Sequence, residues 1–227
     1  MSNKLYIQFG SGTEAVIGWV SFDASPTLAI QKLPILGRLL RPKLNCIFDE
    51  EIRYGDIVKG LPISSESVDG LFCSHVLEHL SYSDFNIALR NSFRYLKPGG
   101  VFRIIVPDLE WCIKAYLKSK QSSDPMQVVK ASIDFMNENG TNLGLNESRL
   151  TIRRRLIDAF RGSGHRWMWD YDSLSSALAN QGFVDIKRFS QGHSEDEMFL
   201  RPERDHQFGN KQDPYGLAIE CRKPAGS

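Results

Sequence analysis

The chain lacks the features that mark several large classes of protein. It has no internal repeat, no low-complexity tract and no apolar run that approaches the roughly 20 residues of a membrane-spanning helix. Its net charge is only +1, from 28 Lys and Arg against 27 Asp and Glu, so no overall field selects nucleic acid or an anionic membrane. These absences favour a globular domain that acts on a small molecule, with neither nucleic acid nor a membrane as its partner.

Cysteine is scarce as well. The four cysteines, Cys46, Cys73, Cys112 and Cys221, are scattered and form no C-x-x-C pair. Cys73 and Cys221 stand in apolar runs typical of strands, where a cysteine is usually a small buried hydrophobe. This usage favours a reducing compartment, and the opening MSNKLYIQFGSG has no signal-peptide pattern, so we expect a cytoplasmic location.

Residues 68–108 predict a strand, a helix and a second strand at the centre of the fold. Val68–Cys73 and Val101–Val106 are continuous apolar runs, which are typical of buried parallel strands. Between them, Lys97–Gly100 predicts a helix stop and a turn. The apolar residues before this stop recur at helical spacing: Phe85, Leu89, Phe93 and Leu96. Because ligands of such sheets bind beyond the carboxyl ends of the strands, we expect a site at Ser74, His75 and Asp108.

The first part of the chain predicts three further strands, each followed by a residue suited to a ligand. Leu5–Phe9 precedes the glycines Gly10 and Gly12, which allow the backbone to approach a ligand closely. Trp19–Phe22 ends at Asp23, whose carboxylate can accept hydrogen bonds from both ribose hydroxyls. Ile52–Tyr54 precedes Asp56, which can accept a hydrogen bond from an exocyclic amine. The alternative is that all of these are ordinary turn residues.

The remaining segments suggest accessory structure. Residues 27–44 are apolar with interspersed Lys and Arg, and we expect a helix pair packed on the sheet, although an amphipathic lid, a membrane-surface helix or an oligomer contact is an alternative. Residues 119–172 are expected to form a lid or substrate region within a single domain, residues 1–227. We expect helices at Glu110–Leu117, Val128–Met136, Leu150–Phe160 and Ser173–Asn180, strands at Val184–Phe189 and Gly216–Cys221, and a long loop at Gln191–Asp213.

Taken together, several segments carry a resemblance. IQFGSG, SFDAS, GDI, FCSHVLEHL, LKPGGVFRIIVPDL and HRWMWDYDSLSSALANQGF, in this order, resemble the class I S-adenosylmethionine-dependent methyltransferases, especially small single-domain bacterial members with a GxG turn and an HVLEH segment. The resemblance covers nearly the whole chain. It implies an α/β fold, a Rossmann-like three-layer sandwich with a seven-stranded, mostly parallel sheet and an antiparallel last strand.

The resemblance also implies a cofactor, S-adenosyl-L-methionine, and a role for each strand-end residue. Gly10 and Gly12 would face its methionine part, Asp23 its ribose and Asp56 its adenine, while Ser74 and His75 would line the pocket. The sequence departs from the family pattern at two positions. Gln8 stands where an acidic residue is usual, and Glu14 stands where a third glycine is usual.

Three residues are candidates for a general base: His75, Asp108 and His165. The hypothesis is that His165 pairs with Asp108 and accepts a hydroxyl proton. The alternative is that the histidines only shape the pocket. We expect Glu78 and His79 to be structural, and Trp167 and Trp169 to be packing residues, although a sugar ring also stacks well on such faces.

The segment from His75 to His79 also matches the H-x-x-E-H pattern of some zinc proteases. In those enzymes the pattern lies within a long helix, whereas here it begins at the end of a predicted strand. The prediction is therefore that this segment binds no metal.

The function predicted from these observations is O-methylation of a sugar or another small polar metabolite. A nicotinamide-dependent oxidoreductase is disfavoured, because Asp23 follows Gly10 by 13 positions (23 − 10) rather than the ~20 of the dinucleotide fingerprint. A non-catalytic domain that keeps the fold as a binding scaffold is the other alternative.

Overall fold

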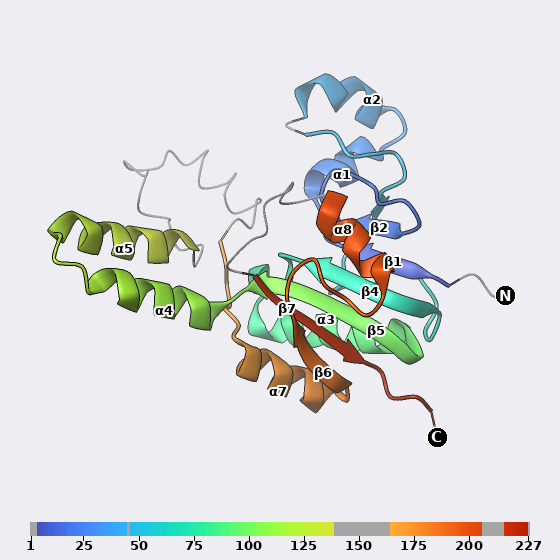
Figure 1. The fold of residues 1–227 in the computed structure, drawn as a ribbon. Helices are drawn as coiled ribbons and strands as arrows, with labels where there is room; N and C mark the ends of the chain where they lie inside the picture. The colour runs from blue at the N-terminus through green and yellow to red at the C-terminus, as the bar shows by residue number, and fades with distance from the viewer. Residues whose placement is uncertain (1–3, 45, 139–163, 206–215, 227) are drawn as a thin grey trace.

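The computed structural model describes residues 4–44, 46–138, 164–205 and 216–226, which are organised around one seven-stranded sheet (Figure 1). The strand order is β3-β2-β1-β4-β5-β7-β6. The pairs from β3 to β5 are parallel, and β7 is antiparallel to both of its neighbours. The predicted α/β class, the seven strands and the antiparallel last strand are therefore confirmed.

The strands lie close to their predicted positions, with one correction. They are β1 Tyr6–Phe9, β2 Val20–Asp23, β3 Arg53–Tyr54, β4 Val68–Ser74, β5 Leu96–Pro107, β6 Val184–Phe189 and β7 Gly216–Arg222. The expected turn at Lys97–Gly100 is instead the first part of β5. Leu96 is paired with Val68, and the β4–β5 register shifts between Val68 and Gly70, so the Pro-Gly-Gly segment is an irregular extension of the strand.

The helices begin and end at recognisable capping residues. They are α1 Pro26–Gln31, α2 Leu36–Leu40, α3 Tyr82–Tyr95, α4 Leu109–Lys120, α5 Pro125–Glu138, α7 Tyr171–Gln181 and α8 Leu200–Asp205, with 3₁₀ turns η1 Arg41–Lys43, η2 Leu77–His79 and η3 Glu197–Phe199. The Ser81 side chain caps α3, and Asp170 forms a capping box at the start of α7. Gly182, with φ +102°, ends α7 in the left-handed conformation, as the sequence predicts.

Two surface segments, residues 191–213 and 119–172, were predicted less well or lie partly outside the described residues. The predicted loop at Gln191–Asp213 contains η3 and α8, so that expectation was wrong. The expected helix at Leu150–Phe160, and much of the expected lid at 119–172, lie outside the described residues.

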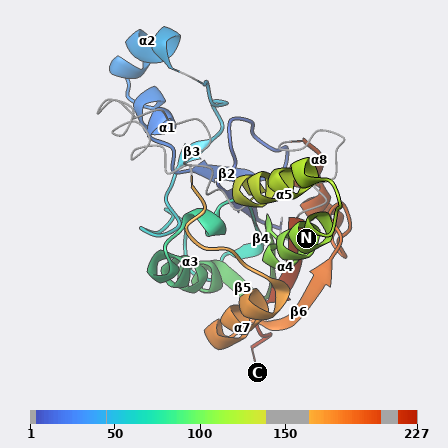
Figure 2. The ribbon, with the colours of Figure 1, turned by 90° about the vertical axis from the view of Figure 1, so that its left-hand side faces the viewer.

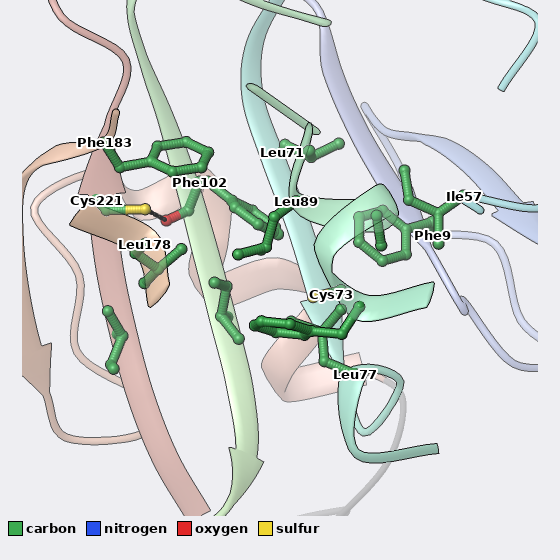
Figure 3. Close-up of a cluster of buried hydrophobic side chains, with 14 of the residues drawn as sticks. Phe9, Ile57, Leu71, Cys73, Leu77, Leu89, Phe102, Leu178, Phe183 and Cys221 are labelled. Carbon is green, nitrogen blue, oxygen red and sulfur yellow. Dashed lines mark hydrogen bonds between the residues drawn. The ribbon is translucent and has the colours of Figure 1, made fainter. Parts of the chain in front are cut away.

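Helices cover both faces of the sheet. On one face, α3 and α7 pack over a large cluster that includes Phe9, Leu71, Phe102, Leu178 and Phe183 (Figure 3). In this cluster the Cys221 thiol lies 3.7 Å from the carbonyl oxygen of Phe102, and both Cys73 and Cys221 are fully buried, as predicted.

The alternate strand residues face the other side of the sheet. There the fully buried Phe199 of η3 packs among Tyr6, Trp19 and Phe72. Since α8 follows η3 directly, this turn and helix form the cover of the second face, which is the third layer of the predicted sandwich.

The predicted helix pair at 27–44 exists but packs on the sheet only in part. Leu28 of α1 is buried with Phe48 and Ile52 before β3. By contrast, Ile35 and Leu39 are 76% and 68% exposed, and α2 lies well away from the sheet in both views (Figures 1 and 2). Among the described residues, no helix has the length and apolar character needed to cross a membrane.

Candidate functional site

The strand order of the sheet has its switch point between β1 and β4. These two strands are adjacent, and successive strands lead away from them in opposite directions, to β2 and β3 on one side and to β5 on the other. In open α/β sheets, the crevice beyond the carboxyl ends at such a point is the usual ligand site. The loops that begin at Gly10 and Ser74 line this crevice.

The two glycines after β1 have different roles. Both have a positive φ, +67° at Gly10 and +69° at Gly12. A Cβ atom at Gly10 would lie 2.1 Å from Cγ2 of Val76, whereas a Cβ at Gly12 would meet nothing within 4 Å. Gly10 therefore allows the loop after β4 to approach, and Gly12 leaves open space beside the turn. The role of both glycines at the methionine part of the cofactor stays a prediction.

Asp23 lies directly against the glycine turn. The backbone N–H of Gly12 donates to Oδ2 of Asp23 at 3.2 Å, and the N–H of Ser25 donates to Oδ1 at 2.8 Å. Burial raises the pKa of the Asp23 carboxyl, while these two backbone N–H groups act in the opposite direction. The structure thus brings together Gly12 and Asp23, two of the residues that the resemblance assigned to the cofactor.

Asp56 follows at the next strand. Its Oδ1 accepts a hydrogen bond from the N–H of Val58 at 2.9 Å, and the N–H of Gly55 donates to the carbonyl of Asp23 at 3.0 Å. Asp56 is therefore a turn residue beside the end of β2, a position that also suits contact with an adenine.

Gln8 is occupied within the sheet. The side chain is 2% exposed, and its Nε2 donates to Oγ of Ser21 at 2.8 Å across the β1–β2 pair. This polar contact accounts for an amide at the position where an acid is usual in the family that the sequence resembles.

Ser74, at the end of β4, adds an orphaned polar group. Its hydroxyl is buried and finds no hydrogen-bond partner within the described part of the chain. The open space at Gly12, the Asp23 carboxylate and this hydroxyl together fit the amino-acid and ribose portions of S-adenosylmethionine. When bound, that cofactor supplies an electrophilic methyl group on a sulfonium.

His75 and Glu78 form a close pair just beyond β4. His75 has a φ of +53°, and its N–H donates to the carbonyl of Ile105 at 3.0 Å. Its Nδ1 lies 3.3 Å from Oε1 of Glu78, a side chain with no exposed surface. The same Oε1 lies 3.9 Å from Nε2 of His79. The 3₁₀ turn η2 thus places one carboxylate between two imidazoles.

His165 joins this pair from a distant part of the chain. Its ring centroid lies 5.1 Å from that of His79. The carbonyl of Glu78 accepts hydrogen bonds from the N–H groups of Arg166 and Trp167, at 2.7 and 3.1 Å. Burial lowers the pKa of the His165 imidazole, the Glu78 carboxylate opposes this effect, and the neighbouring histidines add to it.

The predicted pairing of His165 with Asp108 is replaced by one with Glu78. Asp108 is 2% exposed, and its Oδ2 accepts a hydrogen bond from Nη2 of Arg188 at 2.5 Å. Its Oδ1 caps α4 through the N–H of Glu110 at 3.0 Å. Both oxygens of Asp108 thus have partners, and the carboxylate that acts on the His165 pKa is Glu78. The spacing in the sequence places Glu78 near His75 and His79, whereas its proximity to His165 depends on the fold.

The two tryptophans differ in exposure. Trp169 is 2% exposed and packs on Phe85 with ring centroids 4.1 Å apart, as expected of a packing residue. Trp167 is 44% exposed and lies 5.0 Å, centroid to centroid, from the ring of Tyr82, which is itself 52% exposed. These two rings, hereafter the aromatic pair, are open to solvent beside the backbone of Glu78.

One cavity lies at the opposite end of the sheet. It has a volume of about 650 Å³ and is lined by residues that include Tyr6, Asp69, Lys97 and Arg222. Tyr6 is the first residue of β1 and Asp69 is the second residue of β4, so this cavity is at the amino ends of the parallel strands, opposite the usual ligand side of such a sheet.

Asp23 offers a direct test of the cofactor site. Replacement of Asp23 by Ala should weaken binding of S-adenosylhomocysteine by about 1–3 kcal/mol, the range for a charged hydrogen-bonding group. Isothermal titration calorimetry measures this loss, with Asp134→Ala on the remote helix α5 as a control that should bind normally. An unchanged affinity for Asp23→Ala would contradict the placement of the ribose.

The chain is similar to one protein family and to several solved structures. Residues 10–104 match the family described as "Methyltransferase domain". Among curated proteins, none matches the chain. Solved structures with a similar arrangement include a SAM-dependent methyltransferase of Thermotoga maritima, with 13% identity, 98% of this chain and 83% of that chain covered, and a TM-score of 0.47. Another is a SAM-dependent methyltransferase of Archaeoglobus fulgidus, with 14% identity, 98% and 87% covered, and a TM-score of 0.47.

The family match spans the glycine turn, Asp23, Asp56 and the segment from Ser74 to His79. It therefore favours methyl transfer over the nicotinamide-dependent alternative. Residues 10–104 are similar to a methyltransferase domain, in agreement with the class that the sequence resembles.

Proposed function

We propose that the chain transfers a methyl group to a hydroxyl oxygen of a small polar acceptor, with a carbohydrate as the favoured class. The observation that carries this proposal is the exposed aromatic pair on the chain segments that also hold the histidines. The N–H of Trp167 donates to the carbonyl of Glu78, so the backbone of Trp167 lies beside η2. In this proposal an acceptor stacked on the Trp167 ring extends to the histidine cluster of His75, His79 and His165. Sugar rings present C–H faces that stack on aromatic rings of this kind.

The reaction needs little more than placement and one proton acceptor. As the bond between the acceptor oxygen and the methyl carbon forms, the carbon–sulfur bond breaks and its electron pair goes to sulfur. The hydroxyl proton passes to a histidine of the cluster. His75 and His165, the two histidines named by the sequence, both adjoin Glu78, which stabilises a proton on either ring. Asp108, the third candidate, serves α4 and Arg188 in this proposal.

The test is turnover with labelled S-adenosylmethionine and a panel of sugars, phenols and amines. His165→Gln keeps a hydrogen-bonding side chain but removes the imidazole. This change should lower kcat on the order of a hundredfold while the affinity for S-adenosylhomocysteine stays unchanged. Near-normal turnover in this variant would refute a role for His165 at the reacting oxygen.

The acceptor class is tested separately at Trp167. Trp167→Ala should raise KM for a sugar acceptor, whereas Trp167→Phe, which keeps an aromatic face, should preserve most of the binding. Equal KM values in the wild type and both variants, or turnover with amines only, would contradict a stacked carbohydrate.

A further inference from the structure

Three of the five histidines of the chain converge on one carboxylate. His75 and His79 belong to the segment after β4, and His165 comes from the segment before α7. The coordinating atoms of Glu78, His79 and His165 all lie within 4.8 Å of one another. A metal ion that draws three such atoms to ~2.0–2.2 Å needs only small side-chain movements from these positions.

Glu78 is the unusual member of the group. It has no exposed surface, and within the described residues neither of its carboxylate oxygens has a well-oriented hydrogen bond. The imidazole nitrogens of His75 and His79 lie beside it, at 3.3 and 3.9 Å. Burial of a carboxylate is costly unless the group is paired or coordinates a metal. A cation between Glu78 and its histidines would balance the charge of this buried carboxylate.

The orientation of the His79 ring also supports a cation site. Its Nδ1 lies 3.4 Å from the carbonyl oxygen of Gly164. A carbonyl can only accept, so Nδ1 is the donor in this contact, and Nε2 is the ring nitrogen on the side of Glu78. Histidine ligands of metals usually donate their other ring N–H to a carbonyl or carboxylate in this way.

The framework that holds these groups does not depend on an ion. The two hydrogen bonds from Arg166 and Trp167 to the carbonyl of Glu78 join the segment of His165 to η2. The distance between the two segments is therefore set by backbone contacts, and the side chains are presented to a preformed position.

We propose that Glu78, His79 and His165 bind a divalent transition-metal ion of the zinc type at the acceptor side of the active site. Two imidazoles and one carboxylate suit Zn²⁺, Co²⁺ or Mn²⁺ better than Mg²⁺ or Ca²⁺, which prefer oxygen ligands only. Three protein ligands leave a coordination position open, as in catalytic zinc sites.

This inference rests on the proposed function in one respect, because the open position would receive the acceptor hydroxyl and ease the loss of its proton. With the ion bound, His165 is a ligand, so the proton passes to His75, and His165→Gln lowers kcat through loss of the ion. It reverses the expectation of no metal, which rested on the long helix of the zinc proteases. Here Glu78 itself is a ligand, the turn is a short 3₁₀ segment, and the third ligand comes from His165.

The test measures metal binding directly, without cofactor or acceptor. The full chain, stripped with chelator, is titrated with ZnCl₂ by calorimetry and with CoCl₂ by visible absorption. We expect one ion per chain, a d–d absorption of a four- or five-coordinate Co²⁺, and a higher melting temperature with zinc. Glu78→Gln and His165→Gln should each weaken zinc binding by at least tenfold.

The matched control is His193→Gln, which changes an exposed histidine outside the cluster and should bind zinc like the wild type. Glu78 is buried, so its variant is expected to lose stability by itself; His165, at the edge of the site, provides a second variant with less effect on folding. The absence of stoichiometric binding, or tight binding that survives His165→Gln, would overturn the metal site. Methyl transfer by metal-free protein would overturn the role of the ion at the acceptor hydroxyl, while leaving the proposed methyltransferase function intact.

Discussion

Replacement of Arg103 by methionine should lower the free energy of unfolding by about 3–5 kcal/mol, the range for breaking a buried ion pair from one side. Arg103 lies in β5 with no exposed surface. Its Nη1 donates to Oε1 of Glu220 in β7 at 2.6 Å, and its Nε donates to Glu203 in α8. Without the guanidinium, two carboxylates that are 7% and 8% exposed would remain without their cation.

Urea denaturation of the wild type and the variant measures this loss. Lys114→Met is the matched control, because it removes an i,i+4 ion pair with Glu110 at a position where the lysine side chain is 71% exposed. Such a pair contributes about 0.2–0.5 kcal/mol. The triple change Arg103→Met, Glu203→Gln and Glu220→Gln should recover part of the lost stability. If Arg103→Met costs no more than Lys114→Met, the buried network does not stabilise the fold.

Gly10→Ala should be nearly as damaging, by about 2–5 kcal/mol. The added Cβ would lie 2.1 Å from Cγ2 of Val76, and overpacking of this kind costs about 1–3 kcal/mol. The left-handed φ of +67° adds about 1–2 kcal/mol for any residue with a Cβ. Gly12→Ala has the same backbone penalty but no close contact, so it should cost only about 1–2 kcal/mol.

A double-mutant cycle separates the two contributions. In a Val76→Ala background the Cγ2 atom is absent, so Gly10→Ala should cost about as much as Gly12→Ala. An identical cost of Gly10→Ala with and without Cγ2 would show that the loop after β4 does not press against the glycine turn. Chemical denaturation of the four proteins of the cycle provides the measurement.

The sheet was largely predictable, because the central strands β4 and β5 are mainly apolar runs and most strand ends are marked by Gly, Asp or Pro. The prediction of β6 at Val184–Phe189 matches the structure at both ends. The start of β5 was missed, since Pro-Gly-Gly favours a turn locally, whereas in the fold Leu96 pairs with Val68, and Gly99 and Gly100 form backbone hydrogen bonds with Lys223. The short helix α8 was missed because its polar sequence has no apolar periodicity. Its attachment depends on Phe199, just before it, and on Arg103, which is distant in sequence.

The location of the site in the sheet was easier to predict than the contacts between its side chains. Parallel strands bring their carboxyl ends to one edge, so Gly12, Asp23 and Ser74 could be assigned to that edge from their places after strands. The partner of His165 could not be assigned in this way. Asp108 and Glu78 both follow strands, and the choice between them depends on Arg188 and on the fold of η2, which are contacts that no local pattern encodes.

The contact between Leu109 and Trp169 has an evolutionary consequence. The N–H of Leu109, at the start of α4, donates to the carbonyl of Trp169 at 2.8 Å, and Asp108 forms a parallel bridge with the same residue. The two ends of the stretch 109–169 are therefore adjacent in space, and this does not depend on the residues between them. Insertions whose ends are adjacent are tolerated and exchanged readily. Natural variation, or a designer, can therefore replace this stretch as a cassette while the strand registers stay unchanged.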